Sequence, residues 1–300
     1  MTEMFELFPS VLSIADPFEG VLLDAYGVFW GGNAYGLFPG SAETMAQMLS
    51  QGKVVGILSN TTQLAEKETT KLEKHGLHLG QHFHFLITSG EVARSIFLSE
   101  RLPFATPHHK FWMFGEAHPR YSSLDATFAG TVYRQTDDIQ EADFIYIAVP
   151  HINGEDQVDP ELFREEVKKV VPKKLPMLCP NPDKFAHEGN PPKVVVRQGS
   201  IARLYKEMGG EVFYIGKPHE AAFTVALEQF RNRGISQPKK LLMVGDTPET
   251  DIQGANQAGM ASALIVKTGI MAERISHVGL ESAFKDLPPE DLPTYVIERF

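Results

Sequence analysis

The stretch VLLDAYGV, residues 21–28, places a carboxylate directly after an apolar run that predicts a buried strand. A charge at the tip of such a strand needs a cation or a set of aimed N–H groups to solvate it. Ligands of open α/β sheets bind at the carboxyl ends of the strands, and Gly27 allows a sharp turn just after the acid. Asp24 is therefore a candidate nucleophile or metal ligand, with an ordinary strand-end turn or cap as the alternative.

Composition describes an ordinary globular chain. It has 300 residues, of which 43% are hydrophobic and 22% are charged, so one large domain or two modest ones with a packed core are feasible. The formal net charge is −10, from 38 acids and 28 bases. This charge argues against nucleic acid and against an anionic membrane as the main partner.

Nothing in the sequence calls for an oxidising compartment or a membrane. The single cysteine, Cys179, cannot form an intramolecular disulfide. The first 20 residues carry several acids and lack the basic start and apolar run of a signal peptide. No window of about 18 apolar residues predicts a transmembrane helix. We expect a soluble, cytoplasmic protein.

Short apolar runs alternate with amphipathic segments in the first hundred residues. The expected strands are 21–24, 54–58 and 85–88, and the expected helices are 41–51, 62–74 and 89–98. The alternation resumes near residue 200, with strands at 212–215, 241–244 and 263–266 and helices at 200–208, 220–233 and 251–258. Such repetition predicts an α/β fold with a doubly wound parallel sheet.

The middle of the chain has a different character. Its loops are long and rich in Pro, Asp, Asn and His, with expected strands at 111–114, 144–149 and 176–178 and a helix at 159–171. We therefore expect a core domain of residues 1–89 and 195–300 and an inserted α/β domain of residues 90–194. From residue 287 onward we expect loop with a short apolar finish.

Four groups of residues that could bind a ligand or take part in catalysis follow expected strands of the core. They are Asp24, Ser59-Asn60, Gly216-Lys217-Pro218, and Gly245-Asp246 with Asp251 shortly after. The carboxyl ends of parallel strands lie along one edge of a sheet. The order of these features therefore predicts that acids, a lysine, a hydroxyl and free N–H groups meet there.

This set of groups suits phosphoryl transfer. Mg²⁺ takes carboxylates and waters in octahedral geometry, and an Asp nucleophile can form an aspartyl phosphate. Lys217 would neutralise phosphoryl oxygens and keep Asp24 ionised, while Ser59 and the N–H of Asn60 would bind the remaining oxygens. Each feature alone also has a plainer interpretation, as a helix cap, a solvated turn lysine or a helix-dipole partner.

The chain resembles the haloacid dehalogenase (HAD) superfamily at these positions. Asp24 lies in a segment like its first motif, Ser59 matches the second, Lys217 the third, and the stretch 245–251 the fourth. The long interval between Ser59 and Lys217 resembles subclass IIA, in which a C2-type cap is inserted there. The resemblance implies an HAD-like core, an α/β cap, and a Mg²⁺-dependent phosphatase that acts on a small phosphorylated metabolite.

The resemblance also implies roles for individual residues. Asp24 would be the nucleophile and a metal ligand, together with the backbone carbonyl of Tyr26 and the carboxylate of Asp246, and Asp251 would support the metal. The phosphoryl group would be held by Ser59, Asn60 and Lys217. Asn181 and Asp183 of the cap would face the site, and a cap of this kind makes a homodimer possible.

Tyr26 departs from the phosphatase pattern, which has a second Asp at this position that protonates the leaving group. A phenol, with a pKa of about 10, is a poor base at neutral pH, and losing a general acid or base costs about 10²–10⁴ in rate. Three interpretations follow. The first is a slow phosphatase, the second a non-catalytic phosphate-binding or regulatory protein, and the third a metal-independent 2-haloacid dehalogenase.

Overall fold

The computed structural model describes residues 6–33, 35–116, 124–188 and 193–300, and these form two compact units. Unit 1 comprises Met1–Ser59, Glu66–Ile87 and Lys217–Phe300, and unit 2 comprises Asn60–Ala65 and Thr88–Gly216. Within the described ranges, every helix is too short or too polar to cross a bilayer.

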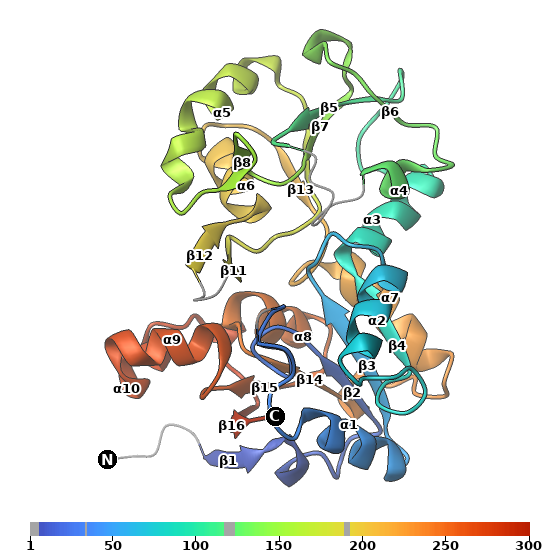
Figure 1. The fold of residues 1–300 in the computed structure, drawn as a ribbon, viewed down its shortest axis with the longest axis vertical. Coiled ribbons are helices and arrows are strands. Elements are labelled where there is room, and N and C mark those ends of the chain that lie inside the picture. Colours follow the sequence, from blue (N-terminus) through green and yellow to red (C-terminus); the bar gives the residue numbers. More distant parts are fainter. Residues whose placement is uncertain (1–5, 34, 117–123, 189–192) are drawn as a thin grey trace. The chain divides into compact units, whose positions relative to one another are not determined.

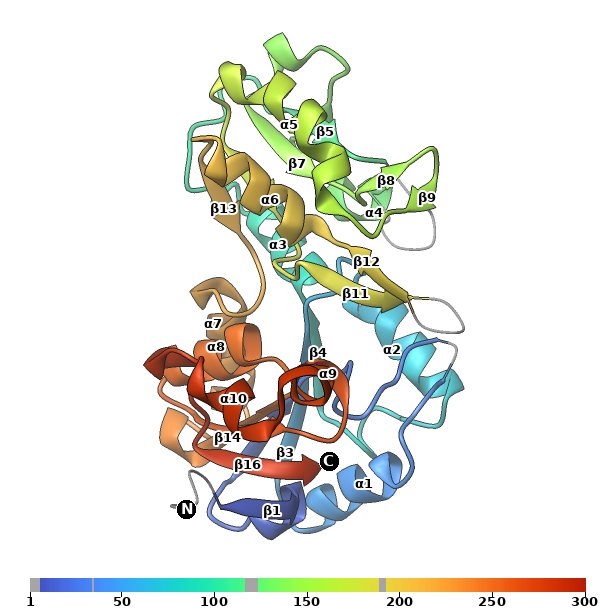
Figure 2. The ribbon, with the colours of Figure 1, turned by 90° about the vertical axis from the view of Figure 1, so that its left-hand side faces the viewer.

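Unit 1 is built on a seven-stranded sheet (Figures 1 and 2). In spatial order its strands are β1 (Leu7–Ser10), β16 (Tyr295–Arg299), β15 (Ala261–Ile265), β14 (Leu241–Gly245), β2 (Gly20–Leu23), β3 (Val54–Ser59) and β4 (Phe85–Thr88). The pairings of β2 with β14 and with β3 are parallel, and Leu23 lies opposite both Val244 and Ile57. The ends of these three strands are therefore level with one another at one edge of the sheet.

Helices cover both faces of this sheet. They are α1 (Ser41–Ser50), α2 (Ala65–Lys74), α7 (Glu220–Arg231), α8 (Gln253–Gln257), α9 (Gly269–Val278) and α10 (Leu280–Lys285), with short 3₁₀ or π turns at Val11–Ser13, Pro238–Lys240, Pro248–Ile252 and Pro289–Asp291. Along β2, Val21 and Leu23 pack in one cluster with Met48 of α1. Gly20, on the alternate face, lies so close to Phe230 of α7 that a Cβ there would be 2.6 Å from its ring. Alternate residues of β2 thus pack against helices on opposite faces of the sheet.

Unit 2 has its own parallel sheet and core. Its strands, in spatial order, are β13 (Val212–Tyr214), β10 (Met177–Cys179), β7 (Phe144–Ile147), β5 (Lys110–Phe114) and β6 (Arg134–Gln135). Two hairpins are formed by β8 (His151–Ile152) with β9 (Glu155–Asp156) and by β11 (Phe185–Glu188) with β12 (Lys193–Val196). The helices are α3 (Ser89–Leu98), α4 (Leu124–Phe128), α5 (Arg164–Val170) and α6 (Gln198–Glu207), with 3₁₀ turns at Ile139–Glu141, Pro160–Phe163 and Val171–Lys173.

The α/β fold with a large parallel sheet is confirmed. The expected placement of the strand near residue 212 was wrong. We expected this strand in the core sheet, but β13 pairs with β10 in unit 2. Unit 2 consequently extends through α6 and β13 to Gly216, beyond the expected boundary at residue 194. A three-residue apolar strand fits either of two parallel sheets, and only the contacts of α6 with β10 and β13 decide between them.

Candidate active site

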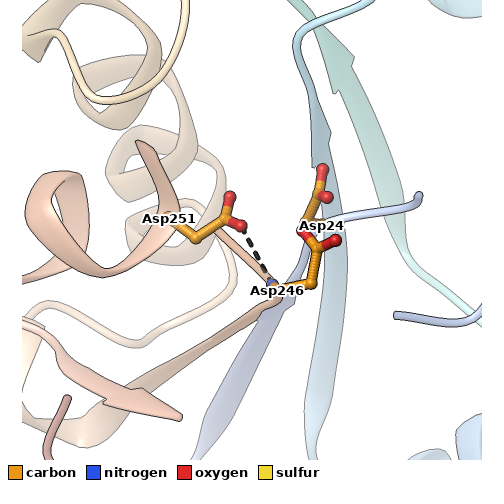
Figure 3. A group of neighbouring side chains, drawn as sticks. All are labelled: Asp24, Asp246 and Asp251. Carbon is orange, nitrogen blue, oxygen red and sulfur yellow. Dashed lines mark hydrogen bonds between the residues drawn. The ribbon is translucent and has the colours of Figure 1, made fainter. Parts of the chain in front are cut away.

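Asp24 and Asp246 follow neighbouring strands in the middle of the unit 1 sheet. Asp24 comes directly after β2, and its backbone N–H donates to the carbonyl oxygen of Val244 at 2.9 Å. Asp246 comes directly after β14, which pairs with β2 in parallel. Figure 3 shows both side chains at the same end of the two strands. The local pattern of apolar run followed by acid thus produces two adjacent carboxylates.

Asp251 completes a group of three acids. Carboxylate oxygens of Asp24, Asp246 and Asp251 all lie within 4.8 Å of one another. Asp251 lies on the turn Pro248–Ile252, and its Oδ2 accepts the backbone N–H of Asp246 at 3.1 Å (Figure 3). The same Oδ2 also accepts the backbone N–H of Thr247 at 3.1 Å. Gly245 leaves room for it, because a Cβ at that position would be 2.2 Å from the Cβ of Asp251.

Lys217 is buried against two of these acids. Its side chain is only 2% exposed, and its Nζ lies 2.5 Å from Asp24 Oδ1 and 2.8 Å from Asp251 Oδ1. Burial alone would lower the pKa of the Lys217 ammonium, but the charges of Asp24 and Asp251 raise it above its ordinary value. Lys217 is therefore a fixed positive charge. The strand that precedes it, β13, belongs to the five-stranded sheet of unit 2.

The acid group and Lys217 together hold more negative than positive charge. Asp24, Asp246 and Asp251 carry three negative charges when ionised and Lys217 carries one positive charge, so these four side chains have a formal charge of −2. Burial, followed by the carboxylates of Asp24 and Asp251, raises the pKa of Asp246 well above its ordinary range. One divalent cation would neutralise the excess, and an all-oxygen donor set suits a hard cation such as Mg²⁺. The residues present therefore fit a divalent metal.

Ser59 lies at the same edge of the unit 1 sheet. It is the last residue of β3, is largely buried, and comes two residues after Ile57, the partner of Leu23. The sequence-based expectation that Ser59 ends a strand beside Asp24 therefore agrees with the sheet register. Its contact with a phosphoryl group stays a prediction.

Asn60, Asn181 and Asp183 come together within unit 2. The Asn60 side-chain amide donates to Asp183 Oδ1 at 2.8 Å, and the N–H of Asp183 donates to Asn181 Oδ1 at 2.9 Å. This arrangement shows one use of the Asn60 side chain that sequence analysis did not anticipate. The expected phosphate contact of Asn60 and the expected orientation of Asn181 and Asp183 toward the site stay predictions.

Tyr26 lies at the surface of unit 1, with 37% of the residue exposed. The ammonium of Lys71, on α2, lies 5.8 Å from the centre of the Tyr26 ring and 5.4 Å from that of Trp30. These are cation–π distances. The tyrosine ring is thus packed beside α2, and the expected role of its backbone carbonyl as a metal ligand stays a prediction.

Sequence analysis missed the residues that contact the Asp246 carboxylate. The Thr247 hydroxyl donates to Asp246 Oδ1 at 2.9 Å, and the N–H of Ile270 donates to Asp246 Oδ2 at 2.7 Å. Ile270 follows Thr268-Gly269, which come after β15. Thr268-Gly269 is thus a fifth polar feature that follows a strand of the core, so the strand-end pattern indicates this segment but not the backbone N–H of Ile270 that makes the contact.

Comparison with known proteins identifies the superfamily. Residues 21–123 match the family model of haloacid dehalogenase-like hydrolases, and residues 214–299 match that of HAD-hydrolase-like domains. The two ranges together include Asp24, Ser59 and the acids of the 245–251 stretch. The chain belongs to the haloacid dehalogenase superfamily of hydrolases.

Individual relatives agree with this assignment. The chain is 24% identical over 321 residues to a 4-nitrophenylphosphatase of Schizosaccharomyces pombe, covering 94% of this chain and 92% of that protein. It is 39% identical over 85 residues to a cardiolipin synthase/mitochondrial hydrolase fusion protein of the same yeast, of which it spans only 14%. A haloacid dehalogenase-like hydrolase from Brucella suis has the same fold, with a TM-score of 0.76 and 21% identity, covering 98% of this chain and 100% of that chain.

Proposed function

We propose that this protein is a Mg²⁺-dependent phosphatase that hydrolyses a small phosphorylated metabolite through an aspartyl phosphate on Asp24. The observation that carries the proposal is the buried group of Asp24, Asp246, Asp251 and Lys217, with its formal charge of −2. Membership of a hydrolase superfamily and similarity to a 4-nitrophenylphosphatase support it. Subclass IIA, with its C2-type cap, agrees with the insertion of most of unit 2 between β4 and Lys217.

The reaction begins with attack by Asp24. One of its carboxylate oxygens forms a bond to phosphorus while the bond from phosphorus to the leaving-group oxygen breaks, and that oxygen takes up a proton from solvent water. A water molecule then attacks the phosphorus of the aspartyl phosphate, which releases inorganic phosphate and restores the carboxylate. Lys217, 2.5 Å from Asp24, keeps the nucleophile ionised and neutralises phosphoryl oxygens as charge develops on them.

The metal would be held by the carboxylates of Asp24 and Asp246 and the carbonyl of Tyr26, with Asp251 supporting it. When bound, Mg²⁺ screens the charge of the phosphate so that an anionic nucleophile can approach it. Ser59 and Asn60 would bind the phosphoryl oxygens that Lys217 does not reach.

Unit 2 would act as the cap that selects the substrate. The contact of Asn60 with Asp183 links the segment after β3 to the turn that holds Asn181. These three residues would therefore contact the substrate as one connected group. A cytoplasmic location and a homodimer remain part of the proposal on sequence grounds.

The phosphatase is tested by phosphate release from 4-nitrophenyl phosphate, with and without Mg²⁺. We expect activity that needs Mg²⁺ and that Asp24→Asn removes. Asp291→Asn is the matched control, because Asp291 is also buried in unit 1 but its Oδ1 accepts from Gln253, at 2.9 Å, and it is not in the acid group.

Two outcomes would replace the proposal with an alternative. Release of halide from a 2-haloacid without metal would favour a dehalogenase. Binding of phosphate without any turnover, unchanged by Asp24→Asn, would favour a non-catalytic regulatory protein. The closeness of Asp246 and Asp251 to Asp24 favours the metal-dependent reaction over both.

A further inference from the structure

The Asp246 carboxylate is held by the beginning of helix α9. Its Oδ2 accepts the N–H of Ile270 at 2.7 Å, and its backbone carbonyl oxygen accepts the N–H of Met271 at 3.1 Å. Both donors belong to the first turn of α9, whose N–H groups have no partner within the helix and whose dipole favours a negative charge. The side chain and the backbone of Asp246 are therefore fixed to the same helical turn.

Two glycines enclose this carboxylate. A Cβ on Gly269 would lie 1.8 Å from Asp246 Oδ2, and a Cβ on Gly27 would lie 2.1 Å from the same atom. Both glycines have positive φ, +69° and +75° respectively, a region that other residues rarely adopt. The carboxylate thus lies against two stretches of bare backbone, one from the nucleophile loop and one from α9.

Thr268 connects these two stretches. Its hydroxyl donates to the carbonyl oxygen of Gly27 at 2.5 Å. Residue 27 is three positions after Asp24, and residue 268 comes one position before α9. One hydrogen bond therefore connects the loop that carries the nucleophile to the helix that orients Asp246.

We propose that Thr268 and Gly269 are positioning residues that fix the Asp246 carboxylate for a divalent metal; the inference rests on the proposed metal site. A carboxylate has about four lone-pair positions, and the contacts with Ile270 and Thr247 occupy two of them. The remaining lone pairs of Asp246 are held in one orientation toward the oxygens of Asp24 and Asp251, within 4.8 Å. Groups that orient a metal ligand in this way typically change metal affinity by about 10–100-fold when they are removed.

The test measures Mn²⁺ binding to the full chain without substrate, by electron paramagnetic resonance of the free ion. Thr268→Val keeps the shape of the side chain but lacks the hydroxyl, and Thr268→Ser keeps the hydroxyl. Gly269→Ala pushes a methyl group against Asp246 Oδ2, whereas Gly279→Ala, at the other end of α9, is the control, because a Cβ there meets nothing within 4 Å although φ is +83°.

We expect Thr268→Val and Gly269→Ala to weaken Mn²⁺ binding by about tenfold or more. Thr268→Ser and Gly279→Ala should bind Mn²⁺ as the parent chain does, even if Gly279→Ala lowers the melting temperature. A merely structural role for Thr268 would change melting temperature without this difference in affinity. If Gly269→Ala does not fold, the difference in Mn²⁺ affinity between Thr268→Val and Thr268→Ser still tests the positioning role of the Thr268 hydroxyl.

Wild-type affinity in folded Thr268→Val, or a parent chain that binds no Mn²⁺, would overturn the inference. Its failure is distinguishable from failure of the phosphatase proposal. A parent chain that binds Mn²⁺ through Asp246 but releases no phosphate would refute the activity and leave the positioning role intact. A parent chain that releases phosphate, with unaltered Mn²⁺ binding in Thr268→Val and Gly269→Ala, would refute the positioning role and leave the phosphatase activity intact.

Discussion

At the scale of single residues, Lys217 supplies a buried positive charge that contacts two of the three acids of the group. Removing one partner of a buried ion pair leaves an uncompensated charge and costs about 3–5 kcal/mol. Lys217 contacts both Asp24 and Asp251. Its ammonium therefore stabilises the fold of unit 1 as well as the proposed reaction.

Lys217→Met should lower the melting temperature and should make that temperature more responsive to Mg²⁺ than in the parent chain. The reason is that loss of the ammonium leaves the three carboxylates more dependent on an added cation. Lys53→Met is the control, since Lys53 is also buried but donates to the carbonyl oxygens of Ala15 and Phe18, at 2.8 and 2.9 Å. Thermal unfolding with and without Mg²⁺ measures both, and an equal Mg²⁺ response in the two variants would contradict the argument.

Tyr26 offers a second test at this scale. Tyr26→Asp should raise turnover of 4-nitrophenyl phosphate, by about tenfold or more, because a carboxyl group can exchange the proton that a phenol holds at neutral pH. Tyr26→Phe should leave turnover unchanged if the phenol hydroxyl takes no part. A folded Tyr26→Asp that is no faster would contradict this account of Tyr26, and a Tyr26→Phe that is much slower would show that the phenol hydroxyl takes part in the reaction.

Three of the acids and bases of the site were predictable because each follows an apolar run. Asp24, Asp246 and Lys217 were selected in this way, Asp251 was selected as a second acid shortly after Asp246, and the structure brings their charged groups together. The contacts of Asp246 with Ile270 were not predictable, since they depend on how α9 is seated against β14. Backbone N–H groups carry no residue-specific signal in a sequence.

At the scale of elements, most of the longer helices and the buried strands were predicted within a few residues, but the ten-residue helix α9 was missed. The other segments missed were short or partly exposed, such as β1, α10 and β16, the last of which lies in the tail expected to be loop. In β16, Val296 and Ile297 are buried at the sheet, and two apolar residues alone do not distinguish a strand from a loop. The assignment of β13 failed for a related reason, because pairing partners are set by tertiary contacts.

An ion pair joins the hairpin of β8 and β9 to Arg197, the residue directly after β12. Asp156 Oδ1 lies 2.8 Å from Nη1 of Arg197 and 3.1 Å from Nε2 of His151. Burial alone would raise the pKa of Asp156, but the hydrogen bond and charge of Arg197, followed by those of His151, lower it below its ordinary value. Asp156 therefore contributes stability that is present above the unfolded pKa, near 4, and lost as the pH falls through the folded pKa.

Replacement of Arg197 by Met should make unit 2 less stable at pH 6, and the difference from the parent chain should shrink as the pH falls below about 4. Denaturation by urea, followed by the fluorescence of Trp112 in β5, measures this at several pH values. Lys168→Met, which removes an exposed pair with Glu165 on α5, should change stability little at any pH. A difference for Arg197→Met that grows on acidification would contradict the assigned sign.

At the scale of the whole molecule, the chain forms two sheets, and the charged group of the candidate site belongs to only one of the two units. The acids and the lysine all belong to unit 1. A ligand that binds only the folded state stabilises it by about 2.7 kcal/mol at a hundredfold excess over its Kd. Stabilisation by a metal should therefore be confined to one of the two units.

Excess Mg²⁺ should slow amide hydrogen exchange in β2, β14 and the first turn of α9, and should leave β5, β7 and β10 unchanged. Exchange followed by mass spectrometry resolves these segments. Asp246→Asn should lose the effect. Slower exchange spread equally over both sheets, or none in β14, would contradict a metal site built from unit 1 alone.

The interrupted path of unit 1 has a consequence for biosynthesis. Asp24 and Lys217 are separated by 193 positions, and β2 lies between β14 and β3 in its sheet. On the ribosome, the nascent chain therefore exposes the apolar β2 long before residues 241–245 are translated to cover its second edge. Unit 2 is complete as soon as Gly216 has emerged. A chain whose translation stops there would carry one finished sheet and one hydrophobic strand with an uncovered edge, the kind of intermediate that chaperones bind.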